Sequence, residues 1–357
     1  MNVIKLLGSE QAFRFNYSRF SNLTVSGAAK MLKYCINFIT LIAISNILIS
    51  DTGRCANAGE HSELHVAVSI KPLHSLVAGV MEGVGKPYLI IRSGASPHSY
   101  QLKPSDAKAL ERSRLVFWIG PQFENFLTKP IQSIGINSES VTLVDTKRLV
   151  LHKNRIPSMQ SGRESHHQTY HRHHNSDSGS DSQYETDMHI WLDPKNAKLI
   201  VGEIVKYVSA ADPKNSIHYQ RNGDKIVRRL DKLMINLNAG LKPVRDRPYI
   251  VFHDAYQYLE KRFNLSKAVS VLASPDRRPG AETIRLLRRR IEKHRPLCAF
   301  SEPQFDPRIL RILLEKRRIE FSTLDPVGVD MAPGPDLYFD MMRKIGKSLT
   351  TCLSRES

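Results

Sequence analysis

Short apolar runs alternate with longer stretches of helical periodicity from residue 64 to the end of the chain. The apolar runs, which predict strands, lie at 64–70, 87–93, 114–120, 249–253, 298–302 and 320–325. Predicted helices include 72–82, 105–112 and 194–209, the last with Asp193 as N-cap and Pro194 at its first position. Because parallel strands need a crossover between them, this alternation predicts an α/β fold with largely parallel sheets flanked by helices.

A charged stretch of helical periodicity, at 218–241, lies between the two sets of predicted strands. Its apolar side chains fall on one face of the helix: Ile226, Leu230, Leu233, Met234 and Leu237. A long helix that joins two lobes fits this position, and an ordinary surface helix of one lobe fits equally well. We expect an N-terminal lobe at 59–212, a linking helix at 213–242 and a C-terminal lobe at 243–357.

One longer apolar run, at 34–50, precedes the α/β pattern. It is shorter than the roughly 20 residues of a membrane-spanning helix; Lys30 and Lys33 precede it and the pattern Ala56-Asn57-Ala58 follows. These features predict a signal peptide that is cleaved after Ala58, with an uncleaved anchor as the alternative. Residues 1–30 are unlike the start of a signal peptide, so initiation at Met31 is as plausible as initiation at Met1.

Composition favours a soluble globular protein, with 41% apolar and 24% charged residues in 357. The net charge of +17, or +13 after cleavage, raises the possibility of nucleic-acid binding. No recognised nucleic-acid-binding module is present, however, and the arginines have the helical spacing of an ordinary solvated face. These are Arg285, Arg288, Arg289, Arg290, Arg317 and Arg318. We therefore expect no nucleic-acid partner.

A polar, histidine-rich tract interrupts the α/β pattern at about 152–187. Five histidines lie within nine residues: His166, His167, His171, His173 and His174. The tract has too few apolar residues to offset the entropy of folding, which predicts a disordered loop. Its histidines suggest weak, multivalent metal capture, and a solvated linker of accidental composition is the alternative.

Three further histidines lie where strands or loops give way to helices, the positions at which α/β folds place ligand sites. They are His98, His189 and His253. A single histidine at such a position is more often structural, but three of them beside a histidine-rich tract favour a metal site. Imidazole nitrogen suits zinc, whereas a manganese site would replace nitrogen with carboxylate oxygen.

Two cysteines, Cys298 and Cys352, remain after the predicted cleavage. An even pair in an oxidising compartment predicts one disulfide, and two unpaired buried thiols are the alternative.

Motifs along the chain resemble those of the zinc-specific solute-binding proteins of bacterial ABC importers. In order from about residue 66 to 352 they are SIKPLHSLVAGVMEGVG, GASPHSYQLKPSDAKAL, WIGPQFENFL, MHIWLDP, VFHDAYQYLEKRF, CAFSEPQFDP and TLDPVGVD. The resemblance implies two α/β lobes bridged by a rigid helix, with the metal in the cleft between them. It also implies that His98, His189 and His253 bind the metal and that Cys298 and Cys352 form a disulfide.

The chain departs from this family at Pro97, where some members carry a glutamate that can approach the metal. Water or another carboxylate must then fill the fourth position. The manganese branch of the family implies Asp325 as a candidate, and an aspartate that caps a turn before Pro326 is the alternative. Glu302 is expected to form a hydrogen bond near the cleft without binding the metal.

The function implied by the resemblance is capture of Zn(II) in the periplasm and its delivery to an ABC permease by a monomeric binding protein. A manganese-binding member of the same importer family is one alternative. A zinc-dependent hydrolase is another, because three histidines and an open water position also form catalytic zinc sites. The sequence lacks the H-E-x-x-H pattern that commonly supplies a hydrolase with its general base, so we expect no enzyme activity.

Overall fold

The structure is a computed structural model that describes residues 64–92, 94–155, 186–272, 280–315, 317 and 319–355. The predicted signal peptide and the five histidines of the tract lie outside these residues. Among the helices that the structure describes, none is both long enough and apolar enough to cross a membrane.

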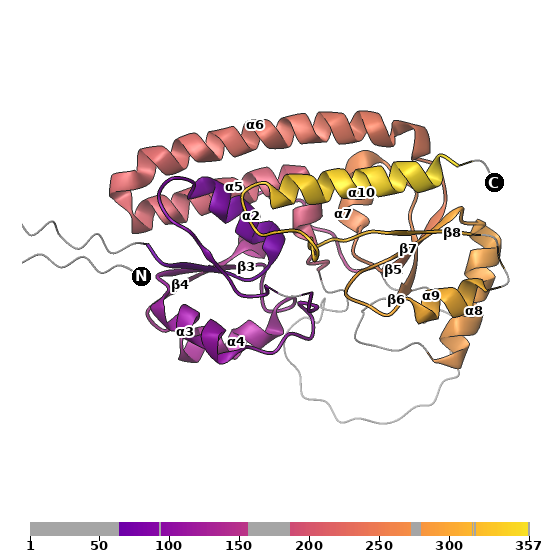
Figure 1. Ribbon diagram of the computed structural model, residues 1–357, viewed down its shortest axis with the longest axis horizontal. Coiled ribbons are helices and arrows are strands. Elements are labelled where there is room, and N and C mark those ends of the chain that lie inside the picture. Colours follow the sequence, from indigo (N-terminus) through magenta and orange to yellow (C-terminus); the bar gives the residue numbers. More distant parts are fainter. Residues whose placement is uncertain are drawn as a thin grey trace, which may run out of the picture. The chain divides into compact units, whose positions relative to one another are not determined.

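The first sheet has four parallel strands in the order β2-β1-β3-β4 (Figure 1). The strands are β1 (Val66–Val68), β2 (Tyr88–Leu89), β3 (Leu115–Trp118) and β4 (Glu139–Thr142). The helices of this lobe are α2 (Lys71–Val80), α3 (Pro104–Arg112), α4 (Asn125–Ser133) and α5 (Pro194–Ala211). Asp193 caps α5 by accepting a hydrogen bond from the backbone N–H of Lys195, as its position before Pro194 predicts.

The second sheet repeats this strand order as β6-β5-β7-β8, again all parallel. Its strands are β5 (Tyr249–His253), β6 (Val269–Leu272), β7 (Cys298–Ser301) and β8 (Glu320–Thr323). Its helices are α7 (Gln257–Phe263), α8 (Ala281–His294), α9 (Arg308–Leu314) and α10 (Leu337–Leu353). The prediction of two α/β lobes with parallel sheets is confirmed. The sequence patterns missed β4 and β6, because polar side chains interrupt the apolar run in each.

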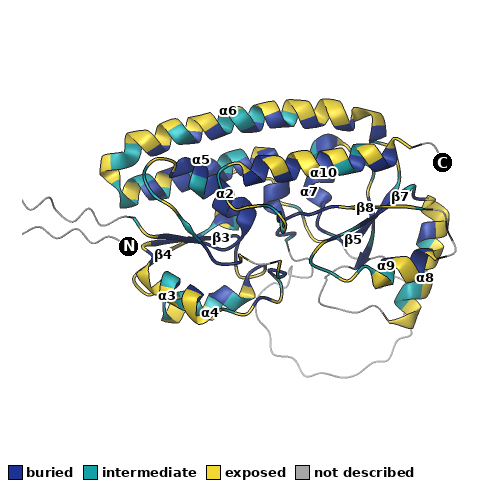
Figure 2. Cartoon of the chain, viewed as in Figure 1, coloured by how far each residue is buried: buried dark blue, intermediate teal, exposed yellow. Residues whose placement is uncertain are grey.

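Helix α6 (Ser216–Leu241) is the long helix predicted between the two sets of strands. It packs against α2 and α5 of the first lobe and against α7 and α10 of the second (Figure 1). Its contact side is buried and its outer side is exposed (Figure 2). Two glycines permit close packing here: a Cβ atom on Gly346 would lie 2.5 Å from Leu237, and one on Gly223 would lie 2.6 Å from Val205.

The second sheet buries its two faces in different clusters of apolar residues. Along β5, Tyr249 and Val251 belong to the large core that includes the first sheet, α6 and α10. Ile250 and Phe252 point to the opposite face, where a smaller core packs under α8 and α9. This alternation follows from the two-residue period of a strand.

The disulfide between Cys298 and Cys352 is present, which confirms the predicted pairing over a sequence separation of 54. It joins the first residue of β7 to α10 near the end of that helix. The C-terminal helix is therefore covalently attached to the second sheet.

Candidate metal centre

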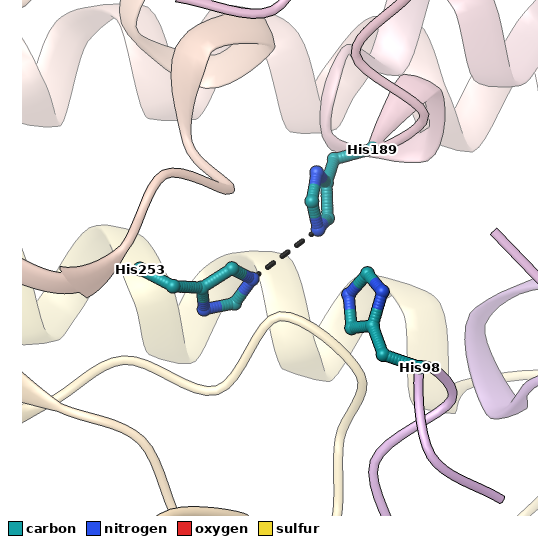
Figure 3. A group of neighbouring side chains, drawn as sticks. All are labelled: His98, His189 and His253. Atoms are coloured by element: carbon teal, nitrogen blue, oxygen red, sulfur yellow. Dashed lines mark hydrogen bonds between the residues drawn. The ribbon is translucent and has the colours of Figure 1, made fainter. Parts of the chain in front are cut away.

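Three elements that are distant in the sequence bring His98, His189 and His253 together (Figure 3). His253 is the last residue of β5, His189 immediately precedes the short 3-10 helix Ile190–Leu192, and His98 lies in the loop between β2 and α3. One ring nitrogen of each lies within 4.8 Å of the others, and the Nε2 atoms of His189 and His253 are 3.3 Å apart. The 3.3 Å separation suits two nitrogens on one tetrahedral zinc ion, whose Zn–N bonds are about 2.1 Å long, whereas any pair as far apart as 4.8 Å must move closer to share the ion.

Buried carboxylates orient two of the three rings. Nδ1 of His253 lies 2.6 Å from Oε1 of Glu302, and Nδ1 of His189 lies 2.8 Å from Oδ1 of Asp187. Since an ionised carboxylate can only accept a hydrogen bond, Nδ1 carries the proton in both rings. Each Nε2 is then left with the lone pair that a metal requires.

The carboxylate of Glu302 also changes the electrostatics of its histidine. Burial by itself would lower the pKa of His253, but the negative charge and hydrogen bond of Glu302 raise it above its usual value. The pKa of Asp187, the carboxylate beside His189, shifts downward. Burial by itself would raise this pKa, but the hydrogen bond from His189 brings it below its usual value.

His98 is held differently from the other two histidines. Within the described part of the chain its ring has no hydrogen-bond partner, and it packs edge-on against Phe123 at 4.8 Å between ring centroids. Burial lowers the pKa of His98 to about 3, and the nearby rings of His189 and His253 add to the shift. His98 is therefore neutral, and able to bind a metal, at ordinary pH.

Aromatic and apolar side chains from both lobes surround the histidines in a small pocket. Its lining includes Pro97, Phe123, Phe305, Pro326 and Val327, with the polar side chains of Glu302 and Gln304. Oε2 of Glu302 and Oε1 of Gln304 are buried and lack a hydrogen-bond partner among the described residues. Both atoms could accept a hydrogen bond from a ligand in the pocket.

Glu124 holds the loop that presents Phe123 to the histidines. Its buried carboxylate accepts hydrogen bonds from the backbone N–H groups of Ile119 and Gly120, at 3.2 and 3.0 Å, and from the Ser69 hydroxyl at 2.5 Å. Gly120 has a φ of +154°, a backbone conformation that favours glycine.

Asp325 is not among the converging ligand atoms. Its carboxylate accepts hydrogen bonds from the backbone N–H groups of Val327, Gly328 and Val329, at 3.1, 2.8 and 2.6 Å. Gly328 has a φ of +69°, so this is a tight turn that requires a left-handed residue. The arrangement matches the turn-capping alternative to metal binding.

The family model for the periplasmic component A of the zinc-uptake complex matches residues 66–352. The chain belongs to this family. A relative from Brucella suis, a high-affinity zinc uptake system protein, is 39% identical over 332 residues, which cover 85% of this chain and 96% of the relative. Members of the family are solute-binding proteins of the periplasm rather than enzymes.

Solved structures share the fold of this protein at low sequence identity. A crystal structure of ZnuA has a TM-score of 0.67 at 18% identity and covers 81% of this chain and 99% of that chain. A manganese-bound periplasmic metal binding protein from Candidatus Liberibacter asiaticus has a TM-score of 0.65 at 17% identity, with the same coverage. At these identities the likeness establishes the fold alone.

The sequence patterns missed two residues of the candidate site, Asp187 and Gln257. Nε2 of Gln257, in α7, donates to Oδ2 of Asp187 at 3.1 Å, and the Tyr258 hydroxyl donates to the Asp187 carbonyl at 2.7 Å. The second lobe thereby helps to hold the carboxylate that orients His189. The spacing of Asp187, two residues before His189, was the available signal.

The described ends of the histidine-rich tract lie beside the candidate site. Lys153 and Thr186 form an antiparallel bridge, and the N–H of Asp187 donates to the His152 carbonyl at 2.8 Å. Arg155, the last described residue at the N-terminal end of the tract, forms ion pairs with Asp254 and Glu260. The tract therefore starts and ends next to the residues that surround His253.

Proposed function

We propose that this protein captures Zn(II) in the periplasm and delivers it to an ABC permease. The convergence of three ring nitrogens within 4.8 Å, on elements from both lobes, carries the proposal. Membership in the zinc-uptake family supports it. A solute held between two lobes can be released when they separate, and such release is what delivery to a transporter requires.

The donor set favours zinc over manganese. All three converging atoms are imidazole nitrogens, which suit a borderline ion such as Zn(II), whereas Mn(II) favours oxygen ligands. The fold itself does not choose between the metals, because the Liberibacter protein with a similar fold is manganese-bound.

A fourth donor is needed to complete a tetrahedral zinc site. Asp325, predicted from the manganese branch, would have to give up hydrogen bonds from backbone N–H groups to reach an ion. We therefore propose that water takes the fourth position and that Asp325 acts by holding its turn.

A hydrolase would need a general base beside that water. The carboxylates next to the histidines, Asp187 and Glu302, are already bonded to the rings of His189 and His253. Oε2 of Glu302 lacks a partner among the described residues and could accept a hydrogen bond from that water, so membership in a zinc-uptake family, rather than the geometry, favours capture over catalysis. We also propose that the protein acts as a monomer, with the permease as its protein partner.

Titration of Zn(II) into the metal-free protein tests the proposed function. We expect one tight site per chain, and a competition experiment with Mn(II) should leave zinc bound. Isothermal titration and metal analysis of protein purified from the periplasm provide the two measurements. A preference for Mn(II), or no tight site, would contradict the proposal.

Export follows from the same proposal and depends on residues outside the described structure. We propose that the segment ending at Ala58 is a cleaved signal peptide. Sequencing the N-terminus of periplasmic protein should begin at Gly59, whereas an intact leader would indicate an anchor.

The histidines of the tract are proposed as weak auxiliary zinc ligands. Deleting residues 160–184 should remove several weak sites and leave the tight site unchanged, because a tract that must order itself binds metal at an entropic cost. The stoichiometry of zinc binding measures this. An unchanged number of bound ions after the deletion would identify the tract as a linker.

A further inference from the structure

We propose that Lys71 is an interlobe positioning residue, which holds the 325–331 loop of the second lobe against the pocket and so slows release of the metal. This inference rests on the proposed function. Lys71 is the first residue of α2, in the first lobe, and the loop joins β8 to α10 in the second lobe.

The ammonium group of Lys71 donates to three carbonyl oxygens of this one loop. Its Nζ atom lies 3.1 Å from the oxygen of Gly328, 2.5 Å from that of Val329 and 2.9 Å from that of Met331. The residue is only 6% exposed. Burying an ammonium is unfavourable unless its donors are satisfied, and here three carbonyls accept from the three N–H groups of the ammonium.

The same loop is held from its other side by its own Asp325. The Asp325 carboxylate accepts from the backbone N–H groups of Gly328 and Val329, and Lys71 donates to the backbone carbonyls of the same two residues. Burial lowers the pKa of Lys71, and the negative charges of Asp325 and Asp330 offset part of this effect. The loop is thus a rigid unit whose position depends on the first lobe.

Two further contacts seat this loop on the first lobe. The indole Nε1 of Trp191 donates to the carbonyl oxygen of Pro326 at 2.8 Å. Gly94 approaches the loop so closely that a Cβ atom there would lie 2.9 Å from Cγ1 of Val329. Trp191 is fully buried and lies two residues after His189, so its contact is directly beside the candidate metal centre.

This seating matters because the loop forms one wall of the pocket. Pro326 and Val327 line it together with the three histidines. Releasing the ion requires that the wall or a ligand move away, and each hydrogen bond from the first lobe opposes such movement. Loss of Lys71 should therefore speed release of the metal and leave the three histidine ligands in place.

Stopped-flow transfer of zinc to an excess of chelator measures the release rate. We expect Lys71→Met to raise the rate by about tenfold, and Trp191→Phe, which removes one hydrogen bond, to raise it by about fivefold. Lys225→Met is the matched control, because Lys225 is exposed and pairs with Glu82 on the surface. Release rates for Lys71→Met and Trp191→Phe within twofold of the wild-type and control values would overturn the proposal.

Hydrogen exchange separates positioning from general stability and needs no zinc. In metal-free protein, Lys71→Met should increase exchange at the amides of Val327, Gly328 and Val329 and leave the amides of β5 protected. This second measurement distinguishes failure of the inference from failure of zinc binding. A uniform rise of exchange in all elements, or a lower melting temperature with unchanged loop exchange, would assign Lys71 a purely structural role.

Discussion

The end of β5 and the loop after β2 both supply a ligand to the candidate metal centre, but they hold it in different ways. His253, at the end of β5, is buried, and its ring is fixed by Glu302. His98, in the loop, has no hydrogen bond to its ring within the described residues, and its orientation depends on packing against Phe123. The site therefore combines a ligand that is oriented before metal arrives with one that can adjust.

The difference follows from the topology of the second sheet. Strands β5 and β7 are parallel neighbours, so their carboxyl ends lie side by side. His253 ends β5, and Glu302 immediately follows β7, which places the carboxylate next to the ring. His98 has no such neighbour, because it lies nine positions after the end of β2, outside the sheet.

Removing a ligand should have the largest effect on zinc affinity. We expect His98→Ala, His189→Ala and His253→Ala each to weaken binding by about 100-fold or more, because each deletes one of three protein donors. His253→Ala should be the most damaging, since it also removes the only side-chain hydrogen bond to the buried carboxylate of Glu302 among the described residues. Isothermal titration with a competing chelator measures the affinities, and wild-type affinity in all three variants would refute the ligand assignment.

Removing an orienting carboxylate should have the next largest effect. We expect Glu302→Gln and Asp187→Asn to weaken zinc binding by about 10- to 100-fold, because an amide is an uncharged, weaker acceptor whose NH2 group can also select the other tautomer of the ring. Asp306→Asn is the matched control, since Asp306 is an exposed carboxylate four residues from Glu302 and pairs with Arg308. Equal affinities of the three variants would show that the rings need no such support.

Acidification should separate the two kinds of ligand. A proton competes with zinc for each imidazole, and the raised pKa of His253 makes it protonate at a higher pH than an ordinary histidine. The pKa of His98, about 3, keeps that ring neutral throughout. Zinc affinity should thus be highest above the raised pKa of His253 and begin to fall at a pH higher than 6.5, the ordinary pKa of a histidine.

The contribution of His253 to this pH dependence can be isolated with Glu302→Gln. The variant removes the charge that raises the pKa of His253, so its affinity should begin to fall at a lower pH than that of the wild type. Titrations at several pH values measure both curves. Parallel curves for the wild type and Glu302→Gln would contradict the electrostatic role of Glu302.

Reducing the disulfide should have the smallest effect on zinc binding. Cys298 lies at the opposite end of β7 from Glu302, so the bridge is remote from the histidines. The bridge spans a sequence separation of 54, and in the loop-entropy model such a bridge stabilises the folded state by at most about 4 kcal/mol. We expect a lower melting temperature with nearly unchanged affinity, and a large loss of affinity would mean that the position of His253 depends on the bridge.

Much of the architecture was predictable, because it depends on local pattern. Short apolar runs located six of the eight strands that the structure describes, and the periodicity at 218–241 located α6. These signals are local, since a buried strand or an amphipathic helix imposes its period on its own residues. The strands β4 and β6 were missed because their local pattern is weak: polar side chains interrupt both, and half of β4 is exposed.

By itself, the sequence determined the two α/β lobes, the three histidines and the cysteine pair. Only the tertiary structure brought the ring nitrogens of the histidines within 4.8 Å of one another and placed Gln257 on Asp187. It also decided that the Asp325 carboxylate binds its own turn and that Lys71 binds the same loop from the other lobe. These contacts join residues up to 260 positions apart, so no local pattern encodes them, and they exist only once both lobes have folded and packed together.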